Sequence, residues 1–553
     1  MDTQTQNPFE QLQKALNDFN TEGAKKKSDL LQECSKEKPA SAKVLSGYHD
    51  NLLFLSAYAD NREVFDMANS EMKRITELVR NSVSLQNKLI NSGIAFTSTQ
   101  STYSLSLLKW LIDIYPGTVS FHSFDESGVH PKEVLKHALP EAEFELLSDD
   151  KLNAEKWLKK ASGRKDAARQ MEWLIRTMDA THTTDLIKDQ LFDSMKVYAE
   201  INPVTEKFSP SFGNVPVKPH YFHNEPLLKK FNEHELINKP LPAERLLTKE
   251  QKKEIIAASR IALCLLQRET DPVTYSEELN IKYYELERGL SIALFSMDAE
   301  RRFPLESYIG FMMFKNGYPM SYGGAWLFGK RSLIGINIFE AYRGGESAVV
   351  FAQLLRCYSK AFGARYFEVE PYQFGKNNPE GIKSGAFWFY YRFGFRPLDN
   401  KLHELALSEH SKITGEKGYR SSQETLKRFT HSNLFVHLDN ERQKPLNPSD
   451  LSRFASHKIV KAFNGDRGKA YKQAVKQLKA EKIITGKENA LGLKKLSILI
   501  AFCIDGSQLK AADKKLLQQM INAKAEEEFR YMEILGRFSF PDHLTEEAKS
   551  FLL

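Results

Sequence analysis

Two glutamates lie two residues apart in the segment RYFEVEPY, whose alternating pattern predicts a β-strand over residues 365–372. Alternation places Glu368 and Glu370 on one face of this strand and Phe367 and Val369 on the other. A strand covered on both faces is apolar throughout, so the pair predicts a polar cleft or an edge position. Burial among aromatic groups would raise the pKa of either carboxylate toward the range of a general base. The alternative is a pair of exposed or salt-bridged glutamates.

A glycine turn upstream of this strand has the composition of an anion-binding loop. Glycines let the backbone approach a ligand closely, and a helix that begins directly after them points its partial positive charge at the same place. A diphosphate fits this arrangement, and an arginine adds charge-assisted hydrogen bonds to phosphate oxygens. The residues concerned are Arg343, Gly344, Gly345, Glu346, Ser347 and Ala348.

Glu346 is the exception in this turn. A carboxylate about 4 Å from a phosphate is repelled by roughly 1 kcal/mol in water and roughly 4 kcal/mol near a protein surface. If the side chain of Glu346 points outward, the backbone donors of the turn remain available to a phosphate. The alternative is that Glu346 is a favourable acid in the first turn of a helix whose loop binds nothing.

Strands on both sides of the turn must hold these groups. Alternating apolar residues predict antiparallel strands over 307–315, 320–328 and 332–340, joined by turns at Asn316-Gly317 and Gly329-Lys330. Together with the strand over 365–372, they predict a mixed sheet in an α/β layer architecture.

Helices must cover this sheet. Apolar residues at three-and-four spacing predict a helix over 347–362 that ends at Gly363 and turns Gln353, Arg356 and Lys360 toward water. The same spacing predicts helices over 283–297, over 384–393, and from a capping box at Thr248 and Gln251 to about Glu269.

In this order, residues 275–410 resemble the GNAT acyltransferase superfamily. That family has a pyrophosphate loop of the form [R/Q]-x-x-G-x-[G/A] after its fourth strand, and often a tyrosine four residues before Gly-Phe in a later helix. The glycine turn stands at the loop, and Tyr390 lies four residues before Gly394. Glu346 stands where the family usually has glycine, and Lys383 where it often has asparagine, whereas Ala386 matches. The resemblance covers about 135 of the 553 residues.

The resemblance implies an α/β GNAT-like core with a central mixed sheet that transfers an acetyl or other acyl group from acyl-CoA to an amine, without a metal. Backbone groups of residues 344–348 would hold the diphosphate, and those of Ile338 and Phe339 would pair with the pantetheine arm. The family's cleft lies where the strand over 365–372 splays from its neighbour, so Glu370 is the first candidate for the base and Glu368 the second. Tyr390 would be the acid that protonates the thiolate, although the alternative is core packing.

Two other functions stay open. The core could be a degenerate one in a non-catalytic binding or scaffold protein, or the donor could be an acyl carrier protein or an aminoacyl-tRNA. Residues 453–495 hold twelve Lys or Arg against three acids, a net charge of +9, which exceeds the +7 of the whole chain. Such a cluster attracts an acidic partner, either a carrier protein or nucleic acid. The alternative is the solvated face of an amphipathic helix.

A chain of 553 residues is too long for one core and predicts several domains. We expect a helical N-terminal domain over 1–201, a proline-rich linker over 202–244, the GNAT-like domain over 245–410 and a helical, basic C-terminal region over 411–553. Seven of the 21 prolines mark the linker: Pro203, Pro210, Pro216, Pro219, Pro226, Pro240 and Pro242.

The sequence favours a cytoplasmic protein without metal. Its four cysteines lie far apart, so neither a disulfide framework nor a zinc site is expected. His220 and His223 lack a matched third ligand. The longest apolar runs are too short to cross a bilayer, and residues 1–13 lack the pattern of an export signal.

Overall fold

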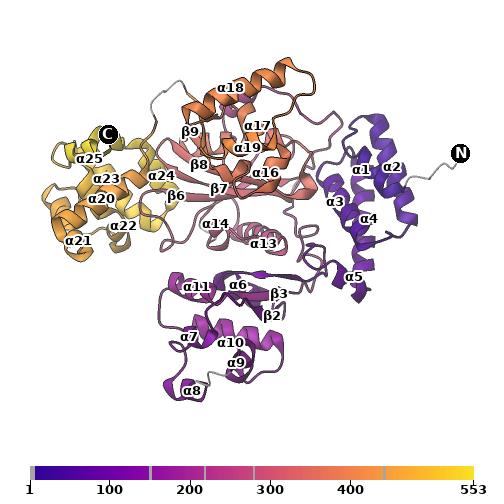
Figure 1. Cartoon of the computed structure of the whole chain (residues 1–553), viewed down its shortest axis with the longest axis horizontal. Coiled ribbons are helices and arrows are strands. Elements are labelled where there is room, and N and C mark those ends of the chain that lie inside the picture. Colours follow the sequence, from indigo (N-terminus) through magenta and orange to yellow (C-terminus); the bar gives the residue numbers. More distant parts are fainter. Residues whose placement is uncertain (1–6, 148–151, 217–218, 278–279, 440–443, 553) are drawn as a thin grey trace.

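A computed structural model of the chain describes residues 7–147, 152–216, 219–277, 280–439 and 444–552. Within these residues, a central sheet of eight strands has helices on both faces and further groups of helices around it (Figure 1). The strand order is β10-β11-β9-β8-β7-β6-β5-β4. The strand bounds are β4 Ile281–Glu285, β5 Leu290–Phe295, β6 Ser307–Lys315, β7 Tyr318–Phe328, β8 Arg331–Ile338, β9 Tyr366–Val369, β10 Arg396–Pro397 and β11 Leu434–His437.

Mixed pairing confirms the predicted α/β class. From β4 to β8 each strand is antiparallel to the next, whereas β8 and β9 are parallel. The three predicted strands before the glycine turn are present as β6, β7 and β8. Asn316 and Gly317 have φ values of +49° and +85° in the turn between β6 and β7, which is the geometry that an Asn-Gly hairpin requires.

The prediction of a helix over 283–297 is wrong, because this segment forms the hairpin of β4 and β5. Arg288 and Gly289 make its turn with φ values of +62° and +68°. Ile292 packs in the core on one face of the sheet, and its neighbour Ala293 packs in a separate core on the other face. A strand buried on both faces is apolar throughout, so periodicity alone does not separate it from a helix.

Helix α15, Ser347–Phe362, has the predicted bounds and ends at Gly363 with a φ of +74°. The expectation that Gln353 and Arg356 face water is wrong, since their exposed fractions are 1% and 2%. Both bind Glu287 in the turn after β4, and the Arg356 Nη1–Glu287 Oε2 distance is 2.7 Å. Arg356 also donates to the backbone carbonyl of Lys239, so a segment distant in sequence covers this face of the helix.

The two faces of the sheet carry different helices (Figure 1). Helices α15 and α17 lie on one face, together with the short helix α16. Helices α13 and α14 lie on the other, and the predicted capping box of Thr248 and Gln251 starts α13, which ends at Leu265 rather than Glu269. The bounds are α13 Lys249–Leu265, α14 Asp271–Thr274, α16 Pro379–Ser384, α17 Ala386–Arg392, α18 Asn400–Gly415 and α19 Gln423–Phe429.

The N-terminal region is not wholly helical as predicted. Helices α1–α4 pack beside the central sheet, and α5 packs against α3 and α4. The chain then forms a second, three-stranded sheet among the described residues, in the order β1-β3-β2. The core of this second sheet includes Cys264 and Leu265, so α13 is shared between the two sheets. The bounds are α1 Pro8–Ala15, α2 Thr21–Lys36, α3 Ala42–Ala57, α4 Arg62–Arg80, α5 Val83–Lys88, β1 Thr99–Thr102, α6 Leu105–Ile114, β2 Val119–Phe124, α7 Pro131–Leu135, α8 Glu141–Leu146, α9 Ala154–Ser162, α10 Ala167–Asp179, α11 Asp185–Ser194 and β3 Val197–Ile201.

The remaining segments also join the central body. The proline-rich stretch contains one short helix among its described residues, α12 Glu233–Asn238. Residues 411–553 supply β11 to the central sheet before they turn helical, since β11 pairs with both β9 and β10. The C-terminal helices are α20 Pro448–Phe463, α21 Arg467–Ala480, α22 Ala490–Cys503, α23 Ala511–Glu526, α24 Glu528–Arg537 and α25 Glu546–Leu552.

Candidate functional site

The parallel strands β8 and β9 separate along their length. Within the described residues they pair at three positions, from Arg331↔Tyr366 to Leu333↔Glu368, although β8 continues to Ile338 beside β7. The side of β8 that faces away from β7 is therefore open after Leu333. The Gln373 side chain lies in this gap, where the Ile336 N–H donates to its Oε1 at 3.3 Å.

Tyr390 reaches the same gap from α17. Its hydroxyl donates to Gln373 Oε1 at 3.4 Å, and its ring packs against Phe351 of α15 with centroids 5.5 Å apart. The side chain is only 4% exposed, and this burial raises the pKa of Tyr390 above its usual value. A phenol with a raised pKa stays protonated at neutral pH, as a proton donor must.

The two glutamates of the β9 segment have different environments. Glu368 is 2% exposed, and its Oε2 lies 2.7 Å from Arg331 Nη2 on the neighbouring strand. Lys444 approaches its other oxygen at 3.7 Å. Glu370 lies beyond the end of β9, directly before the 3-10 turn η2 (Pro371–Phe374), and is exposed. The burial expected of a base is thus found at Glu368, in a salt bridge, and not at Glu370.

The glycine turn lies between β8 and α15, after the 3-10 turn η1 (Glu340–Tyr342). Gly344 is exposed and has a φ of +92°, a value that residues other than glycine rarely adopt. A Cβ at this position would meet open space. Gly345 is buried, and a Cβ there would lie 3.0 Å from the ring of Tyr58, directly after α3. Among the described residues no side chain caps the start of α15. Its first backbone N–H groups therefore remain available to an anion.

The side chain of Glu346 turns into the protein, and its exposed fraction is 1%. Its two oxygens lie 2.5 Å and 3.1 Å from nitrogens of Arg288, in the β4–β5 turn. The backbone N–H of Leu228 donates to Oε1 at 2.8 Å, and Lys315 Nζ lies 3.8 Å from Oε2. Two cations thus balance the carboxylate, so the repulsion of an isolated glutamate from a phosphate does not apply here.

Burial is the main cause of the shifted pKa values of three groups near Glu346. It lowers the pKa of Lys315 to about 7, although Glu346 acts in the opposite direction. Burial likewise lowers the pKa of His223 to about 2, with smaller contributions from Lys315 and Arg288. Burial also lowers the pKa of Lys229, and Glu346 opposes this.

The other residues expected at the coenzyme lie around the same gap. Ile338 lies two residues after Ile336 in β8, so its backbone groups point to the same side, toward the gap. Its carbonyl accepts a hydrogen bond from Arg343 Nε at 3.4 Å. The Phe339 N–H donates to Met320 at the β7 side, so it is not available to a pantetheine arm. Arg343 also pairs with Glu380 of α16 at 3.2 Å, and it is exposed.

The geometry adds four residues that sequence reasoning missed. Gln373, Arg288, Lys315 and Lys229 contact the gap or the glycine turn, yet they come from four separate segments. Only Gln373 had a local signal, because Pro371 and Gly375 bracket it and favour a turn directly after the strand. The other three stand in no sequence pattern that links them to the glycine turn.

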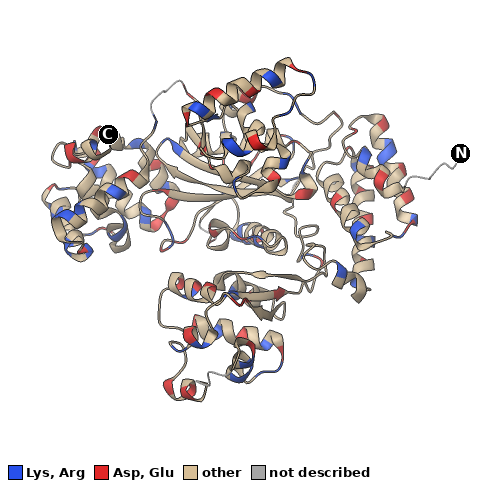
Figure 2. Ribbon diagram, in the orientation of Figure 1, with Lys and Arg blue, Asp and Glu red and all other residues tan. Residues whose placement is uncertain are grey.

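The predicted basic stretch contains an amphipathic helix. Ala470, Ala474 and Leu478 bury one face of α21. The opposite face carries four exposed lysines, which we name the lysine face of α21: Lys469, Lys472, Lys476 and Lys479. Basic residues occur along this helix, at the left of the view in Figure 2. An acidic partner for this face stays a prediction.

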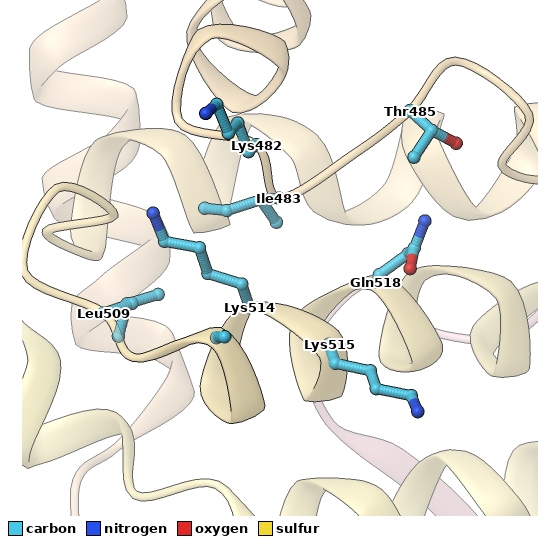
Figure 3. A pocket seen from close by; sticks show the side chains of 8 residues that line it. Lys482, Ile483, Thr485, Leu509, Lys514, Lys515 and Gln518 are labelled. Carbon is cyan, nitrogen blue, oxygen red and sulfur yellow. The ribbon is translucent and has the colours of Figure 1, made fainter.

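A hollow of about 350 Å³ lies next to α21. Its lining residues are Lys482, Ile483, Thr485, Leu509, Ala511, Lys514, Lys515 and Gln518. In Figure 3 Lys514 reaches toward the segment that carries Lys482 and Ile483, whereas Lys515 points the other way. Lys514 donates to the Glu481 carbonyl at 2.8 Å, so this ammonium already has an acceptor.

In the described ranges, no group of three or more His, Cys, Asp or Glu side chains could hold a metal ion. In that part of the chain, every helix is too short or too polar to cross a membrane. Comparison of the chain with protein-family models, curated proteins and solved structures found no match.

Proposed function

We propose that the protein is an acyltransferase of the GNAT type, which binds acyl-CoA in the gap between β8 and β9 and transfers the acyl group to an amine. One observation carries this proposal. Two parallel strands separate beside an uncapped helix that begins at a glycine turn, and a buried tyrosine hydroxyl lies in the gap between the strands.

The residues divide the reaction between them. The amine nitrogen attacks the thioester carbonyl, so a C–N bond forms and the C–S bond breaks. Tyr390 gives its proton to the departing thiolate, and Glu370 takes the proton that the amine loses. An exposed carboxylate suits an acceptor that arrives from solvent. Glu368 is less suited to this role, because it is buried and its Oε2 already binds Arg331.

Backbone groups would hold the coenzyme. The first N–H groups of α15 face the diphosphate, and Ile336 and Ile338 offer the open side of β8 to the amides of the pantetheine arm. Gln373 holds this position in the present structure, because its side-chain amide bonds to Ile336 as the amide of a ligand would.

The same glutamine supports a second candidate function. If Gln373 fills the gap permanently, the core is a scaffold that binds partners without catalysis. The two functions differ in one observable, which is whether acyl-CoA binds at the glycine turn.

Isothermal titration with acetyl-CoA and longer acyl-CoAs tests the proposal, with Gly344→Ala as the site variant. Gly465→Ala is its matched control, because Gly465 also has a positive φ of +80° and open space around a Cβ, on a loop between α20 and α21. We expect the wild type and Gly465→Ala to bind and Gly344→Ala to bind more weakly. If none of the acyl-CoAs binds the wild type at millimolar concentration, the proposal is wrong.

A further inference from the structure

The proline-rich stretch passes directly behind the glycine turn. The ammonium group of Lys229 donates to the carbonyl oxygens of Gly344 and Gly345, and the distance to the second is 2.7 Å. Leu228, its neighbour, binds Glu346 through its backbone. Arg392 of α17 donates to the Lys229 carbonyl at 3.1 Å, which is a further contact that holds this segment in place.

This contact sets the direction of two peptide groups. In a trans peptide the C=O of one residue and the N–H of the next point in opposite directions. Because Lys229 holds the carbonyls of Gly344 and Gly345, the N–H groups of Gly345 and Glu346 point away from it. The Gly345 N–H returns to the Tyr342 carbonyl at 3.2 Å within the turn. The Glu346 N–H then stands at the uncapped start of α15, on the side opposite to Lys229.

We infer that Lys229 is a positioning residue that orients the peptides of the glycine turn, and that it does not contact the bound phosphate. The identity of the ligand rests on the proposed function, whereas the orientation of the peptides by Lys229 does not. A lysine beside a phosphate loop is ordinarily taken as a phosphate ligand. Here the ammonium approaches from the carbonyl side, and two carbonyls already accept its protons.

This role predicts which ligands depend on Lys229. Coenzyme A carries the diphosphate that the turn would bind, whereas pantetheine lacks it and uses only β8. Loss of the ammonium should therefore weaken the binding of coenzyme A by about tenfold, the value of a charge-assisted hydrogen bond. The affinity for pantetheine should not change. A general loss of folding would weaken both ligands equally.

Hydrogen exchange of the unliganded full-length protein tests the positioning directly. Lys229→Gln should speed exchange of the amides at residues 343–348 several-fold, and Lys229→Arg should restore protection, because a guanidinium can also donate to two carbonyls. Lys230→Gln is the matched control, since Lys230 is the adjacent lysine and is likewise exposed, and it should match the wild type. Unchanged exchange in Lys229→Gln would overturn the inference.

Calorimetry with coenzyme A and pantetheine completes the test. Weaker coenzyme A binding by Lys229→Gln with normal exchange would show a direct phosphate contact and overturn the inference, as would equal weakening of both ligands. If the wild type binds neither ligand, the proposed function is wrong, and the exchange experiment alone decides the role of Lys229.

Discussion

Replacing Glu346 by glutamine should destabilise the glycine turn more at pH 6 than at pH 9. The pKa of buried Lys315 is lowered to about 7 by desolvation, and Glu346 acts to raise it. In the wild type Lys315 is therefore charged at pH 6 and neutral at pH 9. Glutamine removes the attraction that keeps this ammonium charged, so the pKa of Lys315 falls further. The stabilisation that Glu346 gives through Lys315 is present below pH 7 and is lost as the pH rises through 7.

The size of the effect follows from that pKa. At pH 6, one unit below 7, the loss through Lys315 is a factor of about ten in the opening equilibrium, or about 1 kcal/mol. A second loss, from Arg288 left without its carboxylate, is the same at both pH values because an arginine does not titrate there. Breaking a buried ion pair costs about 3–5 kcal/mol, so the total effect is measurable at either pH.

Native-state hydrogen exchange suits this measurement, because a chain of 553 residues with several cores does not unfold in one step. Protection factors at residues 312–318 and 343–350 are compared for the wild type and Glu346→Gln at pH 6 and pH 9. The same pair in a Lys315→Met background is the control, and there the pH difference should vanish. An equal effect of Glu346→Gln at both pH values, with Lys315 present, would refute the reasoning.

Three further substitutions test the gap and the basic surface. Tyr390→Phe should lower kcat by about 10²–10⁴ with little change in KM, because only proton transfer is lost, whereas Tyr391→Phe on the same helix should retain activity; an unchanged kcat in Tyr390→Phe would exclude the acid role. Gln373→Ala should tighten acetyl-CoA binding by roughly tenfold in calorimetry, since one competing hydrogen bond to β8 disappears; weaker binding would show that Gln373 holds the ligand instead. Changing the lysine face of α21 to glutamine should lower the salt concentration at which the protein elutes from immobilised heparin, and an unchanged elution would contradict an anion-binding role for this face.

Local signals predicted several elements well. Helix α15 begins and ends at the predicted residues, because an apolar stripe and a glycine at its end specify it without help from distant segments. The Asn316-Gly317 turn likewise marked where β6 ends and β7 begins, although the register shifts by one residue between Met313 and Phe314. Each of these signals lies within a few residues of the feature that it predicts.

Predictions failed where distant segments decide the environment. Arg356 was expected in water, but Glu287 and the proline-rich stretch bury it. Glu346 was judged by its distance from a phosphate, whereas Arg288 and Lys315 set its actual position. The sequence linked Tyr390 to the glycine turn only through a family resemblance, and Pro371 and Gly375 marked a turn around Gln373 without linking it to either. Partners that lie tens or hundreds of residues away leave no periodic trace.

The contact of Gly345 with Tyr58 affects how the protein can be cut into fragments. The prolines suggest residue 245 as a natural start for an isolated catalytic unit. Such a fragment would lack Tyr58, His223, Leu228 and Lys229, and it would leave the carbonyls of the glycine turn and the charges around Glu346 open to water. A shortened version for crystallisation or assay should therefore keep α1–α5 and the proline-rich stretch.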